Sequence, residues 1–164
     1  LEWYIKEILN YNMKIFLLII SILAINLISF TAISEENWKL TKESEYCFIQ
    51  STPITTDIPD GKIRGNYGIL VYTMNNNPDL IVQISAGFNY KSIDSVIVKI
   101  DEGDYNFYTD EDTAWAKNDK KVIFAMKKGL KLITTGVSSK GTKVTDTFSL
   151  SGFTAAVNKL SNDC

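Results

Sequence analysis

The sequence contains no histidine, and Arg64 is the single arginine among its 164 residues. Without histidine, the chain can build neither the usual Ser-His-Asp or Cys-His catalytic groups nor a metal site with an imidazole ligand. Lysine and arginine together number 17 against 19 acidic residues, a balance that does not indicate the basic surface needed to bind nucleic acid. We therefore expect no nucleic-acid partner, and no motif in the chain requires a cofactor.

Cysteine is also scarce, with Cys47 and Cys164 as the two in the chain. In an oxidising compartment, an isolated pair of this kind most simply forms one disulfide. The bond would close a loop of roughly 117 residues, to which the chain-entropy model assigns about 4–5 kcal/mol of stability. A reactive thiol is the alternative, although redox sites usually carry the spacing Cys-x-x-Cys. We expect the disulfide to hold the C-terminus against the first strands.

Long apolar runs are confined to one place, near the start of the chain. A short basic start at residues 13–14 precedes an unbroken apolar run over residues 15–25, and small residues occupy the positions just before Glu35. This layout predicts a cleaved secretory signal over residues 13–34, with the cut between Ser34 and Glu35. The mature protein would then work outside the cytoplasm, in the periplasm or as a secreted protein.

Other interpretations of this segment stay open. The apolar stretch could be a membrane anchor, because it is about 19 residues long, although four polar residues dilute it. Residues 1–12 do not fit a signal of this type, and the good signal headed by Met13 suggests a gene start placed too far upstream. Residues 35–164 remain as a single domain of ordinary size, which meets the membrane only through the signal before cleavage.

Most of this domain has the composition of β-strands. β-Branched and aromatic residues dominate short runs, and turn signals rich in Asn, Asp, Gly and Ser separate these runs. Residues 51–66 are expected to form an ordered loop. The expected strands cover residues 46–49, 67–74, 80–84, 95–100, 105–108, 130–137 and 142–150.

Two segments have helical patterns instead. Asn118 can cap a helix that runs to about Lys128, and Ser151 can cap a second helix that ends just before Cys164. We therefore expect a mainly β fold, an antiparallel β-sandwich or partly closed barrel. Two short helices pack on it, one after Trp115 and one C-terminal, and the disulfide pins the structure.

Arg64 is the one position where a lysine-rich chain uses arginine. An arginine side chain can hold a carboxylate through two parallel hydrogen bonds, which lysine cannot do. We expect a structural clamp on an aspartate such as Asp146, or on loop carbonyls. A contact with an external anion or with a partner is the alternative.

Two further motifs have structural explanations. Residues 136–143 resemble a phosphate-binding loop in their glycine spacing, but Thr142 precedes Lys143, which reverses the order that the motif needs. Because strands flank this segment, we expect a hairpin turn. Trp115 could bind a ligand as an exposed aromatic residue, but we expect it to pack in the core.

The order of several motifs along the domain resembles that of a known family. The motifs are Trp38, residues 46–51, Pro53, Arg64 with Gly65, and residues 87–91, 112–116, 125–129, 136–142 and 146–156, followed by Cys164. Together they resemble the invasion-associated locus B (IalB) family of Gram-negative bacterial envelope proteins, over nearly the whole mature chain. Lys140 stands where relatives often carry arginine, and extra cysteines that some relatives have near the first strand are absent.

This resemblance implies an exported, non-enzymatic protein and supplies no catalytic residues. The implied partner is a protein or another envelope component. The family name comes from roles attributed to some pathogen members in entering host cells, so the resemblance also implies a contribution to envelope function or to host-cell invasion. The shared glycines, core residues and cysteines look structural.

The rival hypothesis is a small envelope hydrolase. Acidic clusters at turns could supply a carboxylate pair for glycoside hydrolysis, or a serine could pair with a nearby lysine, although neither acidic cluster matches a calcium-binding loop. A large cleft with a strongly perturbed carboxylate would favour the enzyme, and a flat exposed apolar or aromatic patch would favour a binding protein. The candidate residues are Asp101, Asp104, Asp110, Asp112, Ser138, Ser139, Lys140 and Lys143.

Overall fold

The computed structural model describes residues 37–74, 77–92 and 96–164. The expected signal and its cleavage point between Ser34 and Glu35 lie outside these residues, as do residues 1–12. In the part of the chain that the structure describes, neither helix has the length and apolar character needed to cross a membrane.

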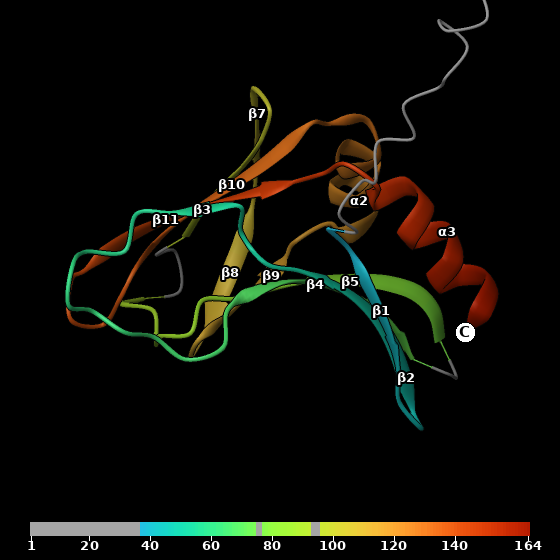
Figure 1. Ribbon diagram of the computed structural model, residues 1–164, viewed down its shortest axis with the longest axis horizontal. Helices are drawn as coiled ribbons and strands as arrows, with labels where there is room; N and C mark the ends of the chain where they lie inside the picture. Colours follow the sequence, from blue (N-terminus) through green and yellow to red (C-terminus); the bar gives the residue numbers. More distant parts are fainter. Residues whose placement is uncertain (1–36, 75–76, 93–95) are drawn as a thin grey trace, which may run out of the picture. The chain divides into compact units, whose positions relative to one another are not determined.

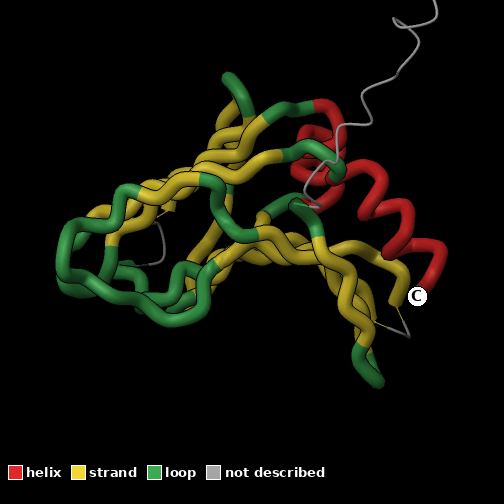
Figure 2. The backbone as a smooth tube through the Cα atoms, in the orientation of Figure 1, coloured by secondary structure: helices red, strands yellow, loops and turns green. Residues whose placement is uncertain are grey.

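Two antiparallel sheets form the described part of the domain, one above the other (Figures 1 and 2). Sheet A has the strand order β1-β2-β4-β5-β9-β8. Its strands are β1 (Lys39–Lys42), β2 (Tyr46–Ser51), β4 (Gly68–Met74), β5 (Asn77–Ser85), β8 (Phe107–Asp110) and β9 (Thr113–Ala116). Sheet B has the order β3-β11-β10-β6-β7. Its strands are β3 (Thr55–Thr56), β6 (Val96–Ile100), β7 (Gly103–Tyr105), β10 (Lys131–Val137) and β11 (Lys143–Ser149).

The core forms from the alternate residues of these strands. On β4, Ile69 and Val71 are fully buried, and on β10 Leu132 is fully buried, because successive side chains of a strand point to opposite faces of its sheet. These residues belong to one cluster that both sheets and both helices share. The sheets do not close into a barrel, so the sandwich form of the predicted fold is confirmed.

The helix α2 (Asp119–Lys128) follows the sequence prediction closely. The side chain of Asn118 accepts a hydrogen bond of 3.0 Å from the backbone N–H of Lys121, which satisfies a donor that the helix itself leaves free. The N–H of Gly129 donates to the carbonyl of Ala125 at the other end. The helix buries Val122, Ile123 and Met126.

The helix α3 (Phe153–Asp163) begins later than the sequence suggests. Ser151 is not its cap, because Gly152 lies between them with a φ of +83° and makes no side-chain cap. Glycine adopts this left-handed conformation without steric cost, so the chain can turn from β11 directly into the helix. Phe153, Val157 and Leu160 are the buried side chains of α3.

One expected strand is in fact two. Tyr105 pairs with Val98 in sheet B, whereas Phe107 pairs with Ala116 in sheet A, so the chain crosses between the sheets at Asn106. The strands β1 and β9 were not expected, and β3 lies inside the segment expected to be a loop.

The predicted disulfide is present and pins α3 to sheet A. Cys47 is buried on β2, Cys164 follows α3, and their Cα atoms are 6.2 Å apart across a sequence separation of 117. Close by, the ammonium of Lys42 donates a 2.7 Å hydrogen bond to the carbonyl of Asp163. The disulfide therefore joins the first strands of the domain to its last helix.

Replacing Cys164 by serine should lower the free energy of unfolding by about 2–5 kcal/mol, because the unfolded chain regains the entropy of the opened loop. Denaturant unfolding, followed by circular dichroism with and without reductant, measures the change. Ser161→Ala, at an exposed position on α3, is the matched control and should alter stability by less than about 0.5 kcal/mol. A wild-type unfolding curve that is the same with and without reductant would contradict the prediction.

Candidate functional site

Arg64, in the loop between β3 and β4, forms a bidentate ion pair with Asp146 of β11. Its two amino groups lie 2.7 and 2.8 Å from the two carboxylate oxygens. The pair is nearly closed to solvent, with side-chain exposures of 4% for Arg64 and 9% for Asp146. Charge-assisted pairs of this geometry are among the stronger hydrogen-bonded contacts in proteins.

The remaining contacts of the guanidinium are also internal. One amino group donates to the carbonyl of Ala86 at 3.3 Å, and the other donates to the hydroxyl of Thr56 at 3.1 Å. The ring of Tyr67 covers the guanidinium, with its centroid 3.6 Å from the central carbon. Because both amino groups are occupied, Arg64 acts as a clamp between loop, sheet B and the end of β5, not as a site for an external anion.

Two aromatic rings are packed beside this clamp. Phe88 and Tyr90 meet edge to face with centroids 5.6 Å apart. They fit because position 136 is glycine, where an added Cβ would come within 2.9 Å of the Tyr90 ring and 3.3 Å of the Phe88 ring. Burial raises the pKa of the Tyr90 phenol, the charge of Asp146 raises it further, and Arg64 acts in the opposite direction. The phenol therefore stays protonated at neutral pH.

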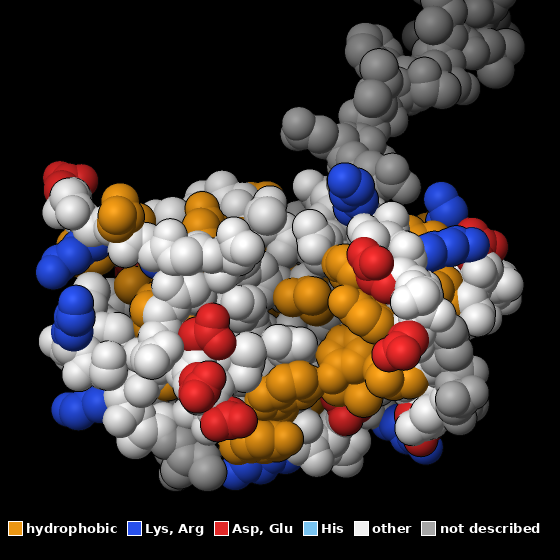
Figure 3. Space-filling model, turned by 90° about the horizontal axis from the view of Figure 1, so that it is seen from below, with side chains coloured by type: hydrophobic (Ala, Val, Ile, Leu, Met, Phe, Trp, Pro, Cys, Tyr) orange, Lys and Arg blue, Asp and Glu red, His pale blue; other side chains and the backbone are white. Residues whose placement is uncertain are grey.

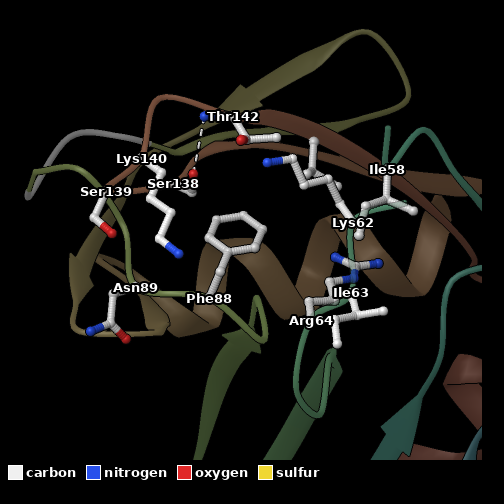
Figure 4. A pocket seen from close by; sticks show the side chains of 11 residues that line it. Ile58, Lys62, Ile63, Arg64, Phe88, Asn89, Ser138, Ser139, Lys140 and Thr142 are labelled. Carbon is white, nitrogen blue, oxygen red and sulfur yellow. Dashed lines mark hydrogen bonds between the residues drawn. The ribbon is translucent and has the colours of Figure 1, made fainter. Parts of the chain in front are cut away.

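A cavity of about 360 Å³ opens next to the clamp, a size within the range of small-molecule sites. We call it the Phe88 pocket. Figure 4 shows Lys62 and Lys140 reaching from opposite sides toward the ring of Phe88. None of the lining residues carries a carboxylate. They are Ile58, Lys62, Ile63, Arg64, Phe88, Asn89, Ser138, Ser139, Lys140, Thr142 and Val144.

The segment 136–143 forms the β10–β11 hairpin, as predicted, and one wall of the Phe88 pocket. The backbone N–H of Ser138 donates to the carbonyl of Thr142, and the Ser138 hydroxyl accepts from the Thr142 N–H at 3.0 Å (Figure 4). Gly141 takes the left-handed conformation, with a φ of +81°. The N–H of Ser139 donates to the carbonyl of Asn89, which ties the hairpin to the neighbouring loop.

The residues of the hydrolase hypothesis serve other purposes or lie outside the pockets. Asp101 accepts hydrogen bonds from the backbone N–H groups of Leu130 and Lys131, and Asp104 pairs with Lys99 at the surface. None of Asp101, Asp104, Asp110 and Asp112 lines the Phe88 pocket or the cavity beside Gln50, Tyr67 and Gln83.

The serine and lysine candidates do not assemble a nucleophile either. Among the described residues, no hydrogen bond joins the hydroxyl of Ser138 or Ser139 to the ammonium of Lys140 or Lys143, which a Ser-Lys mechanism needs. The part of the chain that the structure describes contains no group of three or more potential metal-binding side chains. Ser138, Ser139 and Lys140 share the Phe88 pocket without this hydrogen bond, and the aspartate candidates do not line it.

The outer face of sheet A carries an apolar and aromatic surface that the sequence analysis missed. Strand pairing places Tyr72 beside Phe48 and Ile81, and Trp115 beside Tyr108 and Gln83, all on the side away from the core. Figure 3 shows this surface as one continuous apolar area. We call it the aromatic face. Its members are Tyr46, Phe48, Leu70, Tyr72, Met74, Ile81, Tyr108 and Trp115.

Trp115 is on this face and not in the core, so its predicted place is wrong. On β9 the buried positions belong to Ala114 and Ala116, and the alternation of the strand turns Trp115 outward. Its ring meets Tyr72 edge to face at 6.2 Å, and its indole N–H donates to the hydroxyl of Thr113. The indole is held in place and is only partly buried.

Acidic side chains border the aromatic face (Figure 3). Asp110 is at the end of β8, and Asp79 precedes Ile81 by two residues on β5. Asp119 accepts a 2.7 Å hydrogen bond from the N–H of Val82, next to the same strands. Burial raises the pKa of Tyr72, and the negative charge of Asp119 adds to the effect. Asp79 also forms an exposed ion pair with Lys120, with their charged atoms 3.9 Å apart.

With this geometry in place, the chain can be compared with known proteins. A family model described as "Invasion associated locus B (IalB) protein" matches residues 39–161. The chain belongs to the IalB family. A similar solved structure is the invasion associated protein B of Bartonella henselae, with 17% identity and a TM-score of 0.48, over 76% of this chain and 92% of that one. A comparison with curated proteins finds no match.

In this IalB-family protein, the motifs behind the sequence resemblance have traceable structural roles. Gly136 makes room for Phe88 and Tyr90, and Asp146 holds Arg64. The aromatic face left a weaker signal in the sequence. Residues 69–72 of β4 are apolar or aromatic at every position, which indicates a strand whose two faces are both apolar.

Replacing Arg64 by lysine should lower the free energy of unfolding by about 1–3 kcal/mol, because the carboxylate of Asp146 stays buried with fewer donors. Asp146→Ala should cost more, about 3–5 kcal/mol, because it leaves the guanidinium without its partner. Lys99→Gln is the matched control. It breaks the 3.5 Å ion pair with Asp104, in which both side chains are at least half exposed. The free energy of unfolding should fall by less than about 1 kcal/mol.

Denaturant unfolding of the three variants measures these differences. Equal stability of Arg64→Lys and Lys99→Gln would contradict the clamp.

Proposed function

We propose that this IalB-family protein is an exported, non-enzymatic interaction protein that binds a partner through the aromatic face of sheet A. The aromatic face is the observation that supports the proposal. Scattered apolar residues are normal on a protein surface, but a continuous apolar area with a polar border is typical of interaction sites. Tyr46, Met74 and Tyr108 are each about two-fifths exposed on this face, at 40%, 43% and 41%.

The composition of the face suits a protein partner. Tyrosine, tryptophan, phenylalanine and methionine are enriched at protein interfaces, and tyrosine and tryptophan bury much area at a low cost in side-chain entropy. The ring contacts of Tyr72 with Trp115 and of Tyr46 with Phe48, at 6.2 and 5.9 Å, hold these side chains before a partner arrives.

The charges around the face define the partner further. Asp110 and Asp119 favour a partner segment that presents apolar side chains flanked by lysine or arginine. Such cations can approach both the carboxylates and the faces of the aromatic rings. Gln83 pairs with Leu70 and Trp115 within the face and adds a hydrogen-bonding group there. The proposed occupant is therefore a basic, apolar segment of an envelope protein or, in a host-associated bacterium, of a host-surface protein.

Export is supported by the signal pattern of residues 13–34 and by the disulfide between Cys47 and Cys164. Disulfides persist in the periplasm and outside the cell, where no thiol-reducing system acts on them. The proposed location is the periplasm or the exterior.

Intact mass spectrometry of the native protein tests export. The protein from periplasmic and culture-supernatant fractions should begin at Glu35 and be about two mass units lighter than its reduced form, since a disulfide has two hydrogens fewer than two thiols. A protein that keeps residues 13–34 and stays in the membrane fraction would overturn cleavage and make it a tethered protein.

Site-specific photo-crosslinking tests the aromatic face. A photoreactive phenylalanine derivative in place of Tyr108 should capture one protein in cells, whereas the same group in place of Ile97 should not. Ile97 is the matched control because it is 58% exposed on β6 of sheet B, away from this face. With the purified partner, the double variant Tyr46→Ser and Tyr108→Ser should bind at least about tenfold more weakly, as expected for exposed aromatic contacts.

Phe124→Ser serves as the matched control for that affinity measurement, because Phe124 is 60% exposed on α2 and does not belong to the aromatic face. Its affinity should equal that of the wild type, and raised salt should weaken the wild-type complex. Capture of only a second copy of this chain, or equal binding of the double variant, would contradict the proposal.

A further inference from the structure

We propose that the Phe88 pocket binds a small amphipathic anion, a phosphate or carboxylate attached to an apolar group. The pocket is separate from the aromatic face, and the proposal does not depend on the function assigned to that face. Three features carry it: two lysines without a carboxylate partner, an apolar floor that is fixed in place, and a rim of hydrogen-bond donors.

The charge of the pocket is positive. Asp146 neutralises Arg64 in the wall, so the guanidinium adds no free charge. Lys62 and Lys140 form no ion pair with any described residue, and no carboxylate lines the cavity. Figure 4 shows both side chains directed over the ring of Phe88. Two cations that converge on a concave surface raise the local concentration of anions.

The floor of the pocket is apolar and rigid. Phe88 is fixed by its edge-to-face contact with Tyr90, and Gly136 allows both rings to lie against β10. Ile58 and Val144 add further apolar surface in the wall. An apolar group of the ligand would therefore enter a surface that is already formed, which reduces the entropy cost of binding.

The rim supplies donors that suit an oxyanion. Ser139, Thr142 and Asn89 line the cavity with hydroxyl and amide groups beside the two lysines. The hydrogen bonds of Ser138 hold the backbone of the hairpin that carries Ser139 and Thr142. A phosphate or carboxylate can accept from the lysines and from these groups together.

The apolar part of the ligand could belong to a free small molecule or to a lipid. Ile63 is 97% exposed and lines the same cavity as Lys62. An exposed isoleucine beside a lysine suits an acyl chain below an anionic headgroup as well as it suits a soluble aromatic acid. The shared chemistry is an anionic oxygen group bonded to an apolar body.

Calorimetric titration with phenyl phosphate tests the site, with inorganic phosphate and benzyl alcohol as single-feature probes. Phenyl phosphate should bind at least about fivefold more tightly than either probe. It alone combines a negative charge for the lysines with an apolar ring for the floor of the pocket. The double variant Lys62→Gln and Lys140→Gln should weaken its binding by about tenfold or more. The matched control, Lys39→Gln with Lys131→Gln, removes two exposed lysines from other strands and should bind as the wild type does.

Sedimentation with lipid vesicles distinguishes the two sources of ligand. Binding to phosphatidylglycerol vesicles but not to phosphatidylcholine vesicles, lost in the Lys62 and Lys140 double variant alone, would assign the site to a lipid headgroup. Binding of phenyl phosphate without vesicle binding would assign it to a free small molecule.

Amide chemical shifts locate the bound probe. Those of Asn89, Ser139 and Thr142 should move on addition of phenyl phosphate. If neither phenyl phosphate nor vesicles bind, if both double variants lose binding equally, or if the shifts move on sheet A instead, the proposal is overturned.

Discussion

The ion pair of Arg64 with Asp146 is the interaction on which the arrangement of the loops depends. A buried pair costs desolvation energy, so it is favourable only when its geometry is good and the other donors find acceptors. Here Ala86, Thr56 and Tyr67 provide those contacts. The pair holds the long loop before β4 against both sheets. It also neutralises a positive charge in the wall of the Phe88 pocket, so that the net charge there comes from Lys62 and Lys140.

Sheet A has two apolar faces with different purposes. Its inner face packs against sheet B and the helices, and its outer face is aromatic, half-exposed and bordered by acids. A domain that needed only stability would place polar residues on the outer side of each strand. The outward positions of Tyr72 and Trp115 therefore lower solubility without adding to the core. A surface of this kind is expected where another molecule covers it for part of the protein's lifetime.

The features that could be predicted from the sequence depend on rare residue types or on residues that are neighbours in the chain. The disulfide was predictable because two cysteines allow a single pairing, and the clamp was predictable because arginine, unlike lysine, can bind a carboxylate through two hydrogen bonds. The cap of α2 was predictable because Asn118 acts on a neighbouring residue. The crossing at Asn106 was not, because it depends on which sheet each flanking residue joins. The side on which Trp115 lies depends on the pairing of β9 with β5, and the Phe88 pocket exists only when three distant loops meet.

The covalent link between β2 and the end of α3 has a consequence for resistance to proteases. Almost every residue of the domain lies between Cys47 and Cys164, inside one closed covalent ring. A single cut in an exposed turn outside the Phe88 pocket, such as the one that carries Glu102 between β6 and β7, opens this ring but releases no fragment. The two pieces stay joined and can remain folded, so a nicked molecule keeps both its outer sheet face and its basic pocket.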